Sequence, residues 1–231
     1  MPREGKAARA HRAGRIDEIL ARSYPGSARD LCALEHEGPF QLLVATILSA
    51  QCTDERVNMV TPVLFSRYPD AAALAAAREE DVEEIVKSTG FFRSKAKNLL
   101  GCARALVERE GEAFPTSMED LTALPGVGRK TANVVRSVAL GLPGLPVDTH
   151  VTRLSHRLRL SSSDGAVKIE SDLCALLSPE KWGEISVRLI LHGRRICVAR
   201  KPRCDECELA ELCPSAGLGS LVKAVGQRRR G

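Results

Sequence analysis

The chain has 231 residues, of which 44% are hydrophobic and only 3% aromatic, and its formal net charge is +5. This length allows one large or two small domains, and the core must rest on aliphatic side chains. No apolar run reaches the ~18 residues of a membrane span. The basic N-terminus also lacks the apolar stretch of a secretory signal. We therefore expect no membrane partner and a reducing cytoplasmic setting, in which disulfides are rare.

Basic charge is concentrated at the two ends of the chain. Residues 1–15 carry five basic residues and one acid, and residues 214–231 carry four basic residues and no acid. The sequence therefore predicts basic, disordered tails over residues 1–14 and 214–231, which would add salt-sensitive affinity for a polyanion.

Apolar residues recur at helical spacing along nearly the whole chain. The clearest stripes lie within 40–48, 92–107 and 182–189. No segment alternates as a strand does, and no hairpin turn of the Asn-Gly type is present in the sequence. The predicted fold class is all-α. The Gly- and Pro-rich stretch 141–146 is the clearest break and predicts a passage between two helical domains.

The segment 116–140 predicts two short helices joined by a glycine-containing hairpin. Gly126 and Gly128 allow backbone angles that side chains forbid. The turn points N–H groups outward at the start of the next helix, where the helix dipole favours an anion such as a phosphate. Gly-x-Gly alone is a weak signal, and a plain αα-hairpin is the alternative. A Rossmann or P-loop site is excluded because no strand precedes the glycines.

Lys130 lies in the first turn of the helix that follows the hairpin, off its apolar stripe. A cation at a helix N-terminus is electrostatically unfavourable. Together with partial burial and the neighbouring Arg129, this position would lower the pKa of the lysine. A neutral amine is a nucleophile able to form a Schiff base. The alternative is an ordinary phosphate-binding lysine.

Asp148 follows Pro146 and precedes a helical stretch over 149–159. The simplest interpretation is an N-cap. A capping aspartate is also held ionised and rigid, which suits stabilisation of a cationic sugar transition state. His150 is expected to be structural.

Four cysteines, Cys197, Cys204, Cys207 and Cys213, are spaced C-x6-C-x2-C-x5-C. Four thiolates suit either tetrahedral zinc or an iron–sulfur cluster. Zinc sites usually have two C-x2-C pairs, whereas this set has one, so the spacing favours a cluster. A run of six basic residues from Arg188 to Arg203 leads into the set and indicates either a phosphate-contacting patch or a solvated helix face.

Together, these motifs resemble the endonuclease III family of the helix-hairpin-helix DNA glycosylase superfamily. The segments that carry the resemblance are 48–54, 124–135, 147–151, 191–194 and the cysteine set. The resemblance implies a bilobal all-α enzyme that acts as a monomer and grips duplex DNA between its lobes. A six-helix barrel with a helix-hairpin-helix (about 116–140) would span 23–141. Residues 15–22 and 142–213 would form the second lobe and hold a [4Fe–4S] cluster.

The same resemblance implies a glycosylase and abasic-site lyase of base excision repair, found with the nucleoid. Lys130 would attack C1′ of an oxidised pyrimidine nucleotide or an abasic site, and Asp148 would assist departure of the base. The Schiff base would then undergo β-elimination, nicking the strand. The damaged base must be flipped out of the stack, which costs a few kcal/mol.

Several further residues acquire expected roles from the resemblance. Gln51 would fill the hole left by the flipped base, and Phe91 stands where a leucine wedge is common, so it could stack on the opposite strand. Asp54 corresponds to an aspartate near the pocket or caps a helix, and His150 is a further pocket candidate. The remaining expected DNA contacts are Gly126, Gly128, Arg129, Thr131, Arg200, Lys201 and Arg203.

Three other functions fit parts of the pattern. An adenine-mispair glycosylase shares the cluster and the aspartate but lacks the lysine. A non-catalytic DNA-binding module would not need both Lys130 and Asp148. A zinc-bound structural protein would lack the brown colour of an iron–sulfur chromophore.

Overall fold

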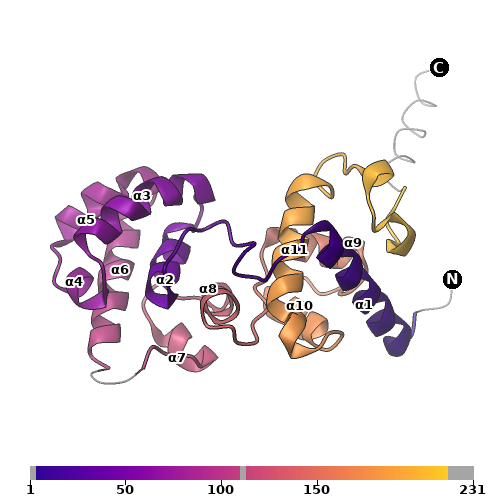
Figure 1. Cartoon of the computed structure of the whole chain (residues 1–231), viewed down its shortest axis with the longest axis horizontal. Helices are drawn as coiled ribbons and strands as arrows, with labels where there is room; N and C mark the ends of the chain where they lie inside the picture. Colours follow the sequence, from indigo (N-terminus) through magenta and orange to yellow (C-terminus); the bar gives the residue numbers. More distant parts are fainter. Residues whose placement is uncertain (1–3, 110–112, 218–231) are drawn as a thin grey trace, which may run out of the picture. The chain divides into compact units, whose positions relative to one another are not determined.

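The computed structural model describes residues 4–109 and 113–217. Within these ranges the chain is helical and contains no strand, which confirms the predicted all-α class (Figure 1). No helix in this part is long and apolar enough to cross a membrane. The predictions for residues 1–3 and for the tail from residue 218 onward lie outside the described residues.

The chain divides into two compact units. One, which we call the hairpin unit, runs from Cys32 to Gly144. The other, the cysteine unit, combines the residues up to Leu31 with those from Leu145 onward. The sequence placed residues 23–31 with the barrel, but they belong to the cysteine unit because Tyr24 is buried in its core.

The hairpin unit is built around α2, whose residues from Leu42 to Leu48 are all buried. Pro39 at the start fixes a backbone angle that suits the first turn of a helix. α2 packs against α3, α6 and α8, while α6 covers α4 and α5. The elements of this unit are α2 (Pro39–Leu48), α3 (Asp54–Arg67), α4 (Ala71–Ala75), α5 (Glu79–Val86), the 3₁₀ turn η1 (Lys87–Thr89), α6 (Phe92–Val107), α7 (Met118–Ala123), α8 (Arg129–Val134) and the π-helical turn η2 (Val135–Ala139).

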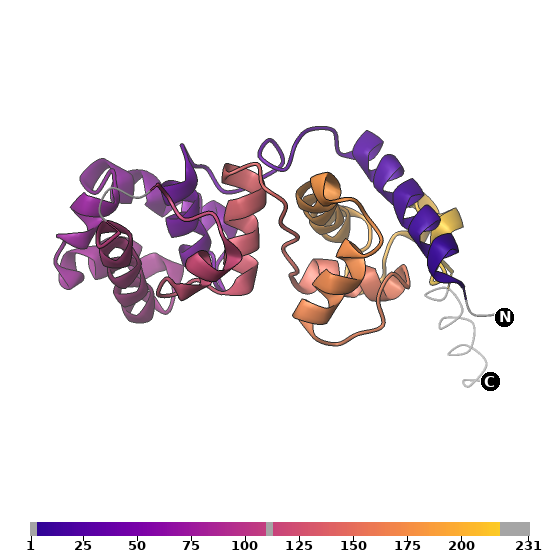
Figure 2. The same cartoon turned by 90° about the horizontal axis from the view of Figure 1, so that it is seen from below.

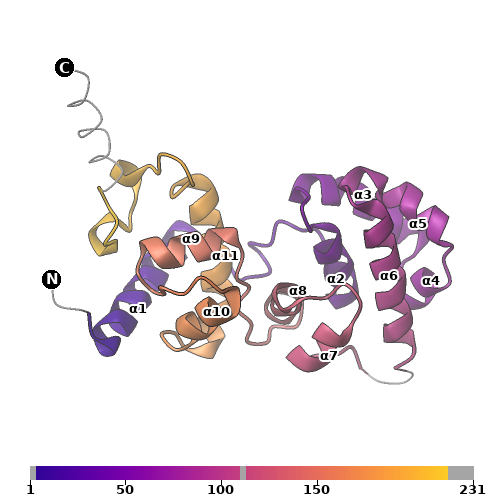
Figure 3. The ribbon, with the colours of Figure 1, turned by 180° about the vertical axis from the view of Figure 1, so that it is seen from behind.

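The predicted hairpin is formed by α7 and α8, which pack against each other (Figure 3). Ser117 caps α7 by accepting a hydrogen bond from the amide of Asp120 at 2.9 Å. Gly128 precedes α8, and Gly141, with a positive φ of 63°, closes the helical run. A glycine in this conformation satisfies the usual requirement of a helix C-terminus.

In the cysteine unit, α11 packs against both α1 and α9. Its core is aliphatic, as the low aromatic content requires, with Ile16, Leu154 and Leu189 almost fully buried. The elements of this unit are α1 (Lys6–Ser23), α9 (Thr149–Arg157), α10 (Ala166–Cys174), η3 (Pro179–Lys181), α11 (Trp182–Arg195), η4 (Cys204–Glu206) and η5 (Ala210–Leu212).

The prediction of a disordered tail over residues 1–14 is wrong from Lys6 onward, because α1 begins there. Ala13 is buried, and the guanidinium of Arg12 donates to the carbonyl oxygens of Leu158 at 2.7 Å and Leu212 at 3.4 Å. Figure 2 shows α1 alongside the C-terminal cysteine segment. The sequence did not predict the first half of this helix because its many charged residues outnumber those of its apolar face, which packs into the core of the unit.

Candidate functional site

Lys130 lies in the first turn of α8, directly after the hairpin. Its side chain is exposed, as is that of Arg129, while Thr131 is half-buried. The partial burial expected for Lys130 is therefore not observed. The helix start presents this amine at the surface of the hairpin unit.

The two hairpin glycines serve different needs. Gly126 has a φ of 76°, and a Cβ atom added there would lie 2.7 Å from Cβ of Asn98. Gly128 has an ordinary φ of −88°, and a Cβ added there would meet no atom within 4 Å. Gly126 is thus required by the fold, whereas the space above Gly128 is open to a ligand such as a phosphate.

Gln51 and Phe91 share an unusual backbone conformation. Both have positive φ angles, 53° for Gln51 and 48° for Phe91, in the left-handed region that side chains disfavour. Both side chains are exposed, and 67% of the Phe91 surface faces solvent. Residues held in this conformation cluster at functional sites, where the surrounding structure maintains the strain.

Asp54 is the first residue of α3 and does not cap it. The cap is Thr53, whose hydroxyl accepts a hydrogen bond from the amide of Arg56 at 3.2 Å. Burial raises the pKa of the Cys32 thiol against the hydrogen bond to Leu34. The half-buried Asp54 carboxylate adds to this rise.

Asp148 caps α9, as predicted. Its Oδ1 accepts hydrogen bonds from the amides of His150 and Val151, each at 2.8 Å. The carboxylate is half-buried and held rigidly at the positive end of the helix. Both of these hydrogen bonds fall on Oδ1, so Oδ2 takes no part in capping the helix.

His150 is tied to the cysteine segment through Arg153. One guanidinium nitrogen, Nη2 of Arg153, lies 3.1 Å from Nδ1 of His150 and donates to the carbonyl oxygens of Gly193 and Cys197. Burial lowers the pKa of His150, and the nearby Arg153 acts in the same direction against the Asp148 carboxylate. A neutral ring with Nδ1 as the acceptor fits this arrangement.

The four predicted cysteines line one cavity of about 280 Å³ in the cysteine unit. Among residues 4–109 and 113–217, no three metal-binding side chains converge closely enough to share a single ion. Four thiols around one cavity are a suitable ligand set for an iron–sulfur cluster. Burial raises the pKa of the Cys207 and Cys213 thiols, so that cluster binding must release their protons.

Arg157 was missed by the sequence reasoning. Its Nη1 donates to Sγ and O of Cys197 at 3.1 and 3.2 Å and to the carbonyl oxygen of Val198 at 2.9 Å. It therefore holds the start of the cysteine segment and orients the first thiolate. A basic residue in the last turn of a helix was the only available signal, and it usually indicates no more than a favourable dipole interaction.

The basic loop between Cys197 and Cys204 is only partly available for DNA. Arg200 and Lys201 are exposed, and Lys201 has a positive φ of 55°. Arg203 instead donates to the carbonyl oxygen of Arg195 and pairs with Glu206 at 3.2 Å. Arg203 thus braces the loop, while Arg200 and Lys201 present their charges outward.

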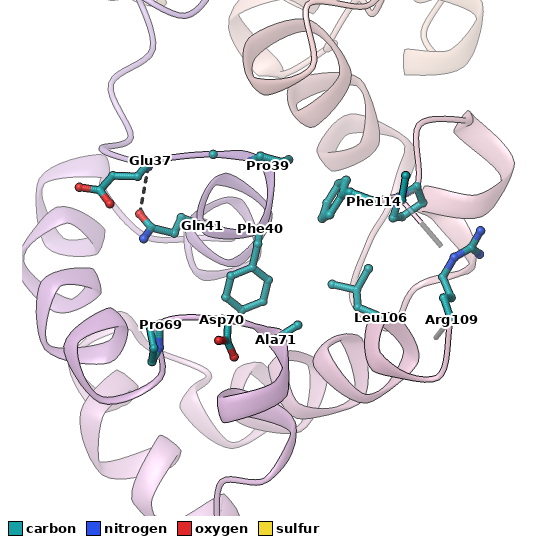
Figure 4. Close-up of a pocket in the computed structure, with 13 residues that line it drawn as sticks. Glu37, Pro39, Phe40, Gln41, Pro69, Asp70, Ala71, Leu106, Arg109 and Phe114 are labelled. Carbon is teal, nitrogen blue, oxygen red and sulfur yellow. Dashed lines mark hydrogen bonds between the residues drawn. The ribbon is translucent and has the colours of Figure 1, made fainter. Parts of the chain in front are cut away.

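A separate cavity of about 410 Å³ lies in the hairpin unit. Figure 4 shows Phe40, Leu106 and Phe114 around it, with the amide of Glu37 donating to the side chain of Gln41. None of the predicted site residues lines it. It adjoins the N-terminal end of α2, whereas Gln51 follows the other end of that ten-residue helix, about 15 Å away.

The structure thus groups the predicted residues by unit. Gln51, Phe91 and Lys130 adjoin α2, α6 and α8, and α2 packs against the other two. Asp148, His150 and the cysteines belong to the cysteine unit.

Two family models match the chain. Residues 44–179 match a family described as HhH-GPD superfamily base excision DNA repair protein. Residues 197–213 match the iron-sulfur binding domain of endonuclease III, over the same span as the four cysteines.

Curated relatives and solved structures agree with these matches. Endonuclease III of Synechocystis sp. is 54% identical over 211 residues, which cover 91% of this chain and 95% of the relative. Endonuclease III of Bacillus subtilis is 45% identical over 183 residues, or 79% and 84% of the two chains. A structure of a trapped endonuclease III–DNA covalent intermediate has a TM-score of 0.83 at 38% identity, and covers 90% of this chain and 97% of that one.

Proposed function

This chain belongs to the HhH-GPD superfamily of base excision DNA repair proteins, and we propose that it removes oxidised pyrimidines from duplex DNA and nicks the resulting abasic site. It is a bifunctional DNA glycosylase and abasic-site lyase of the endonuclease III type. The observation that carries the finer proposal is an exposed lysine, Lys130, in the first turn after the glycine hairpin.

The reaction proposed for Lys130 proceeds in two parts. Its Nζ, once deprotonated, attacks C1′ of the flipped nucleotide and forms a C1′–N bond. The glycosidic bond breaks as the base leaves with a proton. Opening of the sugar then gives a Schiff base. Loss of a proton from C2′ expels the 3′ phosphate, and water releases the lysine from the remaining sugar. The exposed position of the amine supports this role because the substrate must approach it from solvent.

Asp148 is proposed to stabilise the cationic sugar as the base departs. Its Oδ1 is occupied by two helix amides, which fixes the direction of the second oxygen. A carboxylate fixed in advance stabilises developing positive charge without reorganising during the reaction.

The [4Fe–4S] cluster is proposed to be held by Cys197, Cys204, Cys207 and Cys213. When bound, it ties the segment that carries the basic loop into one rigid unit. Arg200 and Lys201 are then proposed to contact DNA phosphates, which position the protein without reading sequence.

A strand-nicking assay on a duplex with one oxidised pyrimidine tests the proposal. Wild type should release the base and cut the strand at the lesion, leaving an unsaturated sugar on the 3′ end. Lys130→Gln should do neither, while still binding the duplex. Nicking by the variant at the wild-type rate would remove Lys130 from the mechanism.

A further inference from the structure

Lys95, on α6, is a buried lysine of the hairpin unit that the proposed chemistry does not use. Only 4% of its surface is exposed. Its Nζ donates to the carbonyl oxygens of Leu48 and Thr89, each at 2.8 Å. Burial lowers its pKa, against the opposing influence of Cys52. Burying an amine is unfavourable unless it is well hydrogen-bonded, so an apolar residue would be the simpler choice at this position.

The two carbonyls belong to the two segments that carry Gln51 and Phe91. Leu48 is the last residue of α2, three residues before Gln51, and its carbonyl lies in the helix end where internal partners run out. Thr89 lies two residues before Phe91, and it is itself buried. A single amine therefore links the two backbone segments that carry Gln51 and Phe91, both of which are exposed residues with positive φ angles.

Lys95 also contacts the second segment through its backbone. Its amide donates to the carbonyl oxygen of Phe91 at 3.0 Å, a first-turn bond of α6 that any residue at this position would make. Left-handed conformations at residues other than glycine persist only where several surrounding contacts enforce them. The side-chain contacts of Lys95 supply such enforcement for Phe91 through Thr89 and for Gln51 through the end of α2.

We propose that Lys95 is a positioning residue, which sets the spacing of Gln51 and Phe91 so that both can enter the duplex together. This inference rests on the proposed function, in which Gln51 fills the hole and Phe91 contacts the opposite strand. The ammonium suits the task because it can donate to two separate carbonyls from one point. Methionine has a similar length but no donor, and Lys97, exposed on the same helix, provides a matched control.

Borohydride trapping on two substrates distinguishes loss of the positioning role of Lys95 from general damage to the folded protein. One is an abasic-site duplex, and the other is the same abasic strand alone, which has no opposite strand to wedge and no hole in a stack to fill. Lys95→Met should lower the trapping rate on the duplex by about tenfold or more, the effect of losing hydrogen bonds to a charged group. Trapping on the single strand should stay within about twofold of wild type, because it tests only the chemistry and the folded state. Lys97→Met should change neither.

A double-mutant comparison tests whether Lys95 acts through the two inserted residues. In the Gln51→Ala, Phe91→Ala background, adding Lys95→Met should not lower the trapping rate on the duplex further, because the effects of coupled residues do not add. Lys95→Arg, which retains the charge and its donors, should recover part of the duplex rate. Equal losses on both substrates, or additive losses, would overturn the proposal.

Fluorescence of 2-aminopurine placed opposite the abasic site reports insertion without requiring turnover. Binding of wild type should change this signal, and binding of Lys95→Met should leave it close to that of free DNA. An unaltered response in the variant would contradict the proposal. If wild type traps neither substrate, the lyase assignment fails instead, and the fluorescence response still decides the role of Lys95.

Discussion

Asp148 combines a structural and a chemical role in one carboxylate, and the two can be separated by substitution. Asparagine caps helices about as well as aspartate, so Asp148→Asn should retain stability. It removes the negative charge, so release of an oxidised base should fall about a hundredfold. Asp148→Ala should also lower the free energy of unfolding by about 1 kcal/mol. Base-release rates and thermal unfolding check both effects, and base release by Asp148→Asn at the wild-type rate would refute the charge role.

Phe91 illustrates a conflict between stability and function at a single residue. Its φ of 48° is unfavourable for a side chain, and 67% of its surface is exposed, so little burial would be lost on its removal. Phe91→Gly should therefore raise the free energy of unfolding by about 1 kcal/mol. The same change should slow excision from duplex DNA. Chemical denaturation and an excision assay measure the two effects, and a destabilised variant would show that the ring packs against the protein.

The hairpin between α7 and α8 allows the two glycines to be distinguished. Gly126→Ala combines a strained φ with a 2.7 Å approach to Asn98, so it should lower the melting temperature clearly. Gly128→Ala meets no atom within 4 Å and has an ordinary φ, so it should melt close to wild type. Its methyl group would nevertheless occupy the space proposed for a phosphate and weaken duplex binding. Equal melting temperatures for the two variants would contradict this assignment.

Elements with strong periodicity or marked ends were predictable from the sequence. The helical run that ends before Gly141 does so as the segment 116–140 predicted, because a glycine with positive φ is a local requirement visible in the sequence. The first half of α1 was wrongly predicted to be disordered because its core-facing residues, such as Ala13, are small and set among charged ones. The roles of Lys95 and Arg157 were not predictable from the sequence. Lys95 depends on the carbonyl group of Leu48 and Arg157 on that of Val198, and each lies more than 40 residues away along the chain.

The four predicted cluster ligands all lie in the cysteine unit, so loss of the cluster should be a local event. The segment 197–213 is otherwise held by contacts of Arg12 and Arg157 and by the buried Leu209. Removing the cluster by oxidation and chelation should lower the stability of the cysteine unit and leave the stability of the hairpin unit unchanged. Hydrogen exchange resolved by segment measures this, and equal loss of protection in α2 and α6 would show that the cluster supports both units.

The proposed mechanism requires that Lys130 forms a covalent Schiff base with an abasic sugar. Borohydride trapping on an abasic-site duplex, comparing wild type with Lys130→Ala and with the control Lys97→Ala, tests it most directly. Wild type and the Lys97 variant should form a covalent adduct, and the Lys130 variant should form none. An adduct from Lys130→Ala would assign the nucleophile to another amine. Absence of any adduct from wild type that still binds the duplex would contradict the lyase mechanism itself.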